Sequence, residues 1–64
     1  MTPMTPEEIR DVRQRAGMTQ QHFAEYLGAS LSSVSKWERG EVAPKSQAII
    51  RNLERLRDTI ESLG

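Results

Sequence analysis

The stretch TQQHFAEYLGASLSSVSKWERG, from Thr19 to Gly40, decides the fold of this chain. Thr19 and Ser30 each stand where an N-cap residue would begin a helix. Gly28 and Gly40 each stand where a helix would end, since glycine readily adopts left-handed backbone. The stretch therefore predicts two short helices joined by a tight turn.

The apolar residues of this stretch are spaced as two crossing helices require. Ala24 is small enough for a close crossing point, while Val34 and Trp37 would turn inward and hold the second helix against the first. This spacing is typical of a helix-turn-helix, whose second helix enters a groove of DNA. Any hairpin of two helices would show similar spacing, but the caps on both helices favour the DNA-binding motif.

The segments on either side predict two more helices. Before the motif, Thr5, Pro6 and Glu8 make the N-cap, first-turn proline and capping box of a helix. We expect Met1 to Met4 to be a frayed tail. After the motif, Ser46 is placed to cap a last helix without glycine or proline. The sequence thus predicts an all-α, compact four-helix fold. The expected single domain spans residues 1–64, with helices over residues 6–16, 20–27, 31–39 and 47–63.

Composition excludes several kinds of site. With one histidine and no cysteine, the chain cannot supply the roughly four ligands of a zinc site, so we expect no metal and no cofactor. His22 lies near several serines but lacks an orienting group and a pocket, so an enzyme is not expected. No apolar run approaches the roughly 20 residues that span a bilayer, and no signal-peptide core follows Met1. We therefore expect a cytoplasmic protein.

The charge of the chain argues mildly against nucleic acid as a partner. Net charge is zero, whereas DNA-binding proteins usually carry a basic excess. The distribution partly answers this objection, because Lys36, Arg39 and Lys45 cluster near the second helix of the motif against Glu38 and Glu41. The other acidic residues concentrate in the first and last helices. The small local excess predicts modest non-specific affinity and a dependence on dimerisation.

The motif resembles the Cro/CI (xenobiotic-response-element, XRE) family of phage and bacterial repressors. The resemblance rests on the pieces Met18-Thr19-Gln20-Gln21, Phe23-Ala24-x-x-Leu27-Gly28-Ala29-Ser30 and Val34-Ser35-Lys36-Trp37-Glu38-Arg39-Gly40. It covers the first three expected helices and their junctions. It implies a lambda-repressor-like fold and a sequence-specific, usually dimeric transcriptional repressor.

The resemblance also implies which residues contact DNA. Base contacts are expected from Leu31, Ser32, Ser33 and Lys36, and phosphate contacts from Gln20, Arg39 and Lys45. The inward positions of Val34 and Trp37 agree, because they turn residues 32, 33 and 36 outward. Lys36 can donate to guanine O6 or N7, and Leu31 can meet a thymine methyl. For the serines, a merely solvated helix surface is the alternative.

Two charged residues are expected to hold the motif together. The resemblance implies an ion pair between Arg13 on the first helix and Glu38 near the end of the third. A partly buried pair of this kind fixes registry more surely than it adds stability. We therefore interpret Glu38 as structural, with an ordinary surface carboxylate as the alternative.

The long last helix departs from the family, which usually ends in two short helices. Its apolar residues Leu56, Ile60 and Leu63 extend beyond any core expected of so short a chain. A leftover apolar strip usually marks a partner surface. We expect a homodimer formed through this strip, with recognition helices about 34 Å apart and a palindromic operator. The alternative is that the strip folds back on its own core.

The sequence therefore predicts an autoregulating repressor that binds double-stranded DNA. One alternative is an antitoxin of a toxin–antitoxin operon, in which the strip from Leu56 to Leu63 would bind a toxin. An accessory regulator from a phage or mobile element fits the size equally well.

Overall fold

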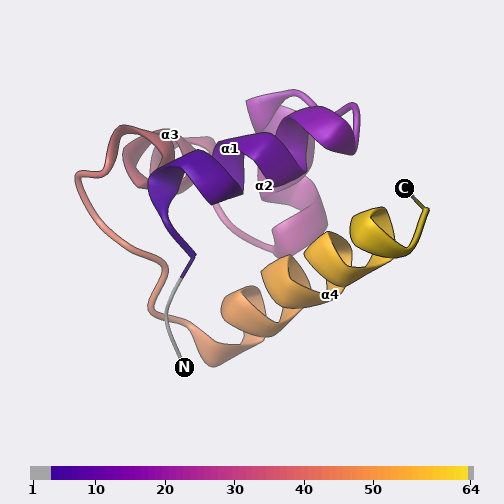
Figure 1. The fold of residues 1–64 in the computed structure, drawn as a ribbon. Helices are drawn as coiled ribbons and strands as arrows, with labels where there is room; N and C mark the ends of the chain where they lie inside the picture. Colours follow the sequence, from indigo (N-terminus) through magenta and orange to yellow (C-terminus); the bar gives the residue numbers. More distant parts are fainter. Residues whose placement is uncertain (1–3, 64) are drawn as a thin grey trace.

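A computed structural model describes residues 4–63 of the chain. It contains α1 (Pro6–Arg15), α2 (Gln20–Leu27), α3 (Leu31–Arg39) and α4 (Gln47–Leu63), as Figure 1 shows, and no strand within the described range. The expected all-α fold with four helices is confirmed. The first helix ends one residue before the expected boundary, because Ala16 is its C-cap.

Each helix start follows from a local hydrogen bond. The hydroxyl of Thr5 accepts from the backbone N–H of Glu8 at 3.1 Å, and the Glu8 carboxylate accepts from the backbone N–H of Thr5 at 3.1 Å. Thr19 and Ser30 cap α2 and α3 through their hydroxyl oxygens in the same way. Because these caps satisfy amides that a helix leaves unpaired, they fix where each helix begins.

The core lies where all four helices meet. In Figure 1, α4 runs along one side of the group formed by the other three helices, and it packs against α1 and α2. Helix α3 also packs on α1 and α2. The buried apolar side chains are Ile9, Val12, Phe23, Ala24, Leu27, Val34, Trp37, Leu53 and Leu56. Burial of such side chains is the main force that holds a small domain without disulfides together.

The start of the described chain contributes to this core. Residues 1–3 lie outside the described range, so the expectation of a frayed tail concerns Met4 alone within the structure. That expectation is wrong for Met4, which is partly buried and packs against the core.

The structure also corrects the expectation for the apolar strip of α4. Leu56 belongs to the core with 9% of its surface exposed, and Ile60 packs against that core, whereas Leu63 is 84% exposed. The expectation that the strip lies beyond the core is wrong for Leu56 and Ile60. Helix α4 packs on both α1 and α2, so its apolar face stays covered further along than chain length suggested. Leu56 and Ile60 instead pack on the core of their own chain, which was the alternative expectation for the strip.

No helix within residues 4–63 combines the length and the apolar character needed to cross a bilayer.

Candidate nucleic-acid interface

The inner face of α3 is fixed in the core. Val34 is fully buried, and Trp37 and Glu38 are each 5% exposed. Because a helix repeats every 3.6 residues, these positions turn the opposite face outward. The predicted base-contacting residues Leu31, Ser32 and Lys36 are exposed there, in agreement with the sequence reasoning.

Ser33 differs from the other predicted base-contacting residues. It is half-buried, and its backbone N–H donates to the Ser30 hydroxyl at 3.1 Å. The Ser30 hydroxyl in turn donates to the Ser33 hydroxyl oxygen at 2.9 Å. Ser33 is therefore part of the cap of α3, and its hydroxyl already has one partner.

The turn between α2 and α3 has the backbone that the sequence indicated. Gly28 has φ +75°, a left-handed conformation that side-chain-bearing residues seldom adopt. The backbone N–H of Ala29 donates to the carbonyl of Ala24 at 2.8 Å, which closes the end of α2. Ala24 itself is 1% exposed in the core. The turn thus sets the direction of α3 relative to α2.

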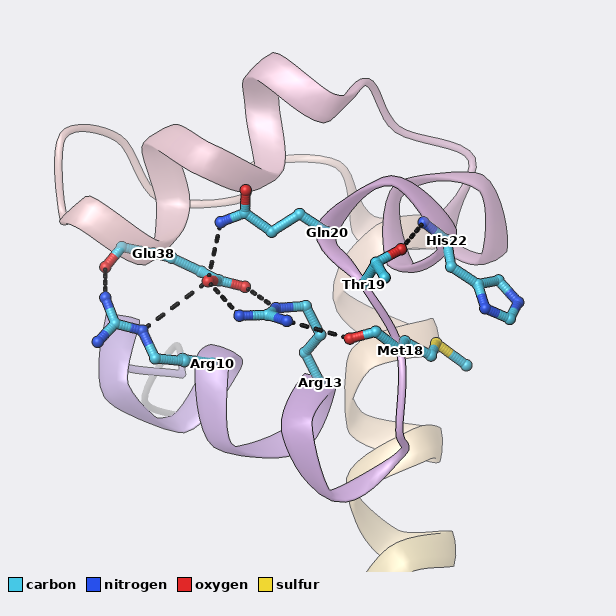
Figure 2. A network of polar contacts seen from close by, with 7 residues as sticks. All are labelled: Arg10, Arg13, Met18, Thr19, Gln20, His22 and Glu38. Atoms are coloured by element: carbon cyan, nitrogen blue, oxygen red, sulfur yellow. Dashed lines mark hydrogen bonds and ion pairs between the residues drawn. The ribbon is translucent and has the colours of Figure 1, made fainter.

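The ion pair between Arg13 and Glu38 is present (Figure 2). Arg13 Nε donates to Glu38 Oε2 at 2.7 Å, and Arg13 Nη2 donates to Glu38 Oε1 at 3.1 Å. A third bond runs from Arg13 Nη1 to the carbonyl of Met18 at 3.0 Å. The side chain of Glu38 is only 3% exposed. The pair therefore joins α1, the segment before α2, and the last turn of α3.

Two further residues reach Glu38, and the sequence reasoning missed both roles. Gln20 Nε2 donates to Glu38 Oε1 at 3.1 Å. Arg10 Nε lies 3.8 Å from the same oxygen, and Arg10 Nη2 donates to the Glu38 carbonyl at 3.4 Å. Arg10 lies one turn before Arg13 on α1, and that i, i+3 spacing was the available signal. Figure 2 shows these side chains converging on one carboxylate from α1 and α2. We call the group of Arg10, Arg13, Gln20 and Glu38 the Glu38 network.

This environment keeps Glu38 ionised. Burial alone raises the pKa of Glu38, because a low-dielectric surrounding disfavours the charged carboxylate. The hydrogen bonds from Arg13 and Gln20, together with the charges of Arg13 and Arg10, outweigh this effect and hold the pKa below its ordinary value. Glu38 is therefore an ionised carboxylate in the folded protein.

The predicted phosphate-contacting residues are in three different situations. Gln20 uses its amide nitrogen in the Glu38 network, although the other hydrogen on Nε2 is still available to a phosphate. Arg39 is exposed and forms an ion pair with Glu41, in which Arg39 Nε lies 2.8 Å from Glu41 Oε2. Lys45 is exposed in the loop after α3.

Within residues 4–63, no group of three or more histidine, cysteine, aspartate or glutamate side chains could hold a metal ion. The exposed His22 side chain points away from the Glu38 network in Figure 2, and the backbone N–H of His22 donates to the Thr19 hydroxyl.

A family model described as helix-turn-helix matches residues 9–57, which include α2, α3 and the turn between them. No curated protein matches the chain.

Proposed function

Because the chain belongs to the helix-turn-helix family, in its Cro/CI (XRE) type, we propose that this DNA-binding transcription regulator is a sequence-specific repressor. In this proposal α3 enters the major groove of an operator upstream of the protein's own gene. The regulator works in the cytoplasm, where bacterial and phage DNA lies.

The orientation of α3 is the observation that carries the proposal. Its inner face is held by the buried Val34 and Trp37 and by the Glu38 network, so the helix is presented as a rigid element. Its outer face carries Ser32 and Lys36, short and long hydrogen-bonding groups suited to base edges in the major groove. A rigid helix with a polar outer face is what direct readout requires.

We include a homodimer and a palindromic operator in the proposal. One copy offers a single long polar side chain, Lys36, among its base-contacting residues, so one half-site gives little affinity. Two copies related by a two-fold axis would place their recognition helices about 34 Å apart, one turn of DNA. Since Leu56 is buried within one copy, we narrow the contact to the exposed Leu63 and the uncovered part of Ile60.

A gel-shift series tests the DNA-binding part. The probes are the DNA upstream of the gene and a scrambled duplex of equal length, each at several salt concentrations. Lys36→Ala should lose discrimination between the two probes by about 1–3 kcal/mol. Lys45→Ala should weaken binding to both and lower the salt slope by about 1. Arg51→Ala removes an exposed cation from α4 and serves as the matched control. Equal binding of the wild type to both probes would refute a sequence-specific repressor.

Sedimentation tests the dimer separately. At micromolar concentration we expect the wild type to sediment as a dimer and Leu63→Glu as a monomer that binds the operator weakly. Leu63 is 84% exposed, so this change leaves the core intact. A monomeric wild type whose operator affinity is unchanged by Leu63→Glu would refute the dimer.

No observation favours the antitoxin alternative. It relied on a free strip from Leu56 to Leu63, and the core covers the first part of that strip. The proposal therefore keeps DNA as the partner and assigns no toxin.

A further inference from the structure

The basic side chains on the outer side of α3 differ in whether a carboxylate pairs with them. Lys36 and Arg39 are three residues apart, so they lie on the same side of α3, and exposed Lys45 follows in the loop. Among residues 4–63, the ion pairs on this side of α3 involve Arg39 but neither lysine. The Arg39 and Glu41 side chains are about half exposed, at 57% and 52%, with Arg39 Nε 2.8 Å from Glu41 Oε2.

The backbone fixes Glu41 beside the last turn of α3. Gly40 reverses the chain with φ +77°, and its N–H donates to the Trp37 carbonyl at 3.1 Å. The N–H of Glu41 then donates to the Lys36 carbonyl at 2.9 Å. These two bonds make a compact helix end, so the Glu41 side chain starts from a defined place next to Arg39.

A carboxylate is poorly suited to this place on grounds of stability. The C-terminal end of a helix carries partial negative charge, which favours cations such as Arg39 and disfavours anions. An exposed ion pair offsets little of that cost. Glu41 is therefore difficult to explain as a residue that stabilises the fold.

We propose that Glu41 occupies the position of a DNA phosphate on Arg39 and thereby lowers the affinity of this interface for every duplex. The inference rests on the proposed function, because it assumes that Arg39 faces the DNA backbone. A phosphate must displace the Glu41 carboxylate from Arg39 and then lie close to its negative charge. Glu41 thus reduces non-specific binding, so that base contacts and dimerisation decide which sites are occupied.

Neutralising Glu41 gives a gain of function, which a damaged fold cannot mimic. Binding of Glu41→Gln to a random-sequence duplex is measured by fluorescence anisotropy from about 50 to about 200 mM salt. We expect about three- to tenfold tighter binding at the lower salt, from removal of a charge a few ångströms from phosphate. The salt slope should steepen by about 1, for one more phosphate contact.

Asp58→Asn is the matched control. Asp58 is an exposed carboxylate on α4 with Arg57 Nη2 at 3.5 Å from its Oδ1, so this change also removes one negative charge and one arginine contact. Its expected gain is less than about twofold, because screening weakens charges more than about 10 Å away. A gain for Glu41→Gln no larger than that of Asp58→Asn would overturn the inference.

A double variant tests whether Glu41 acts through Arg39. In an Arg39→Gln background, Glu41→Gln should gain less than about twofold, since the cation it frees is absent. An undiminished gain would overturn the role of Arg39. Thermal unfolding should show Glu41→Gln at or above the wild-type midpoint. If the wild type binds no duplex at all, the proposed function fails together with this inference, whereas wild-type binding without a specific gain refutes the inference alone.

Discussion

Arg13 and Arg15 provide a sharp test of how the motif is held together. Both are arginines on α1, but Arg13 is 15% exposed and pairs with buried Glu38, whereas Arg15 is 59% exposed and pairs with exposed Asp11. We compare Arg13→Met with Arg15→Met. Methionine keeps an unbranched apolar stem of similar length, so each change removes mainly the guanidinium.

The expected magnitudes differ several-fold. Arg13→Met leaves the Glu38 carboxylate buried without its main partner, which typically costs about 3–5 kcal/mol. We expect the lower end, about 3 kcal/mol, because Gln20 and Arg10 still contact the carboxylate. Arg15→Met loses an exposed i, i+4 pair worth about 0.5 kcal/mol or less. Since a domain of this length has about 3–10 kcal/mol in total, Arg13→Met would remove about a third or more of the free energy of unfolding.

Urea unfolding followed by Trp37 fluorescence measures both variants, because Trp37 is 5% exposed and becomes solvated on unfolding. Thermal midpoints should fall by about 12–24 °C for Arg13→Met and by about 4 °C or less for Arg15→Met. Adding Glu38→Gln to Arg13→Met should restore part of the loss, because the unpaired buried charge is then gone. Equal destabilisation by the two single variants, or no recovery in the double variant, would refute the buried-pair account.

Three other changes follow from the same structure. The pKa of Glu38 lies below its ordinary 4.5 in the folded state, so its contribution to stability is complete above pH 4.5 and is lost as the pH falls through the folded value. Urea titrations should therefore show the stability difference between wild type and Glu38→Gln shrinking below pH 4.5. Gly28→Ala should cost about 1–2 kcal/mol at φ +75°, and chemical denaturation measures it. Leu56→Ala should cost about 2–5 kcal/mol at 9% exposure, against less than about 0.5 for Leu63→Ala at 84%. Equal losses for the two leucines would contradict the packing of α4.

The features that the sequence predicted well depend on neighbours along the chain. A cap at Thr19 or Ser30 needs only the backbone amide three residues later. The left-handed turn at Gly28 needs only a residue without a side chain. Such local requirements can be read directly from the order of residue types, and they predicted the helix boundaries.

The features that were missed depend on distances across the fold. The contacts of Arg10 and Gln20 with Glu38 join residues 28 and 18 positions apart in the chain. The i, i+3 spacing places Arg10 on the same side of α1 as Arg13, but it does not show that a carboxylate on α3 lies within reach. The burial of Leu56 was missed for a related reason, because it depends on how α4 crosses α1 and α2. The periodicity of apolar residues showed that one face of α4 is apolar. It did not show how far along α4 the other helices cover that face.

The hydrogen bond between Gln20 and Glu38 links the start of α2 to α3. Gln20 is the first residue of α2, and its amide nitrogen is bonded to a carboxylate that belongs to α3. A phosphate held at the start of α2 would therefore act on a residue already joined to the recognition helix. In the proposed complex, the position of α3 in the groove would then depend on that phosphate contact through the hydrogen bond between Gln20 and Glu38. The charge of Glu38 would then do more than stabilise the fold, because it would keep α2, proposed to contact phosphate, and α3, proposed to contact bases, in one register.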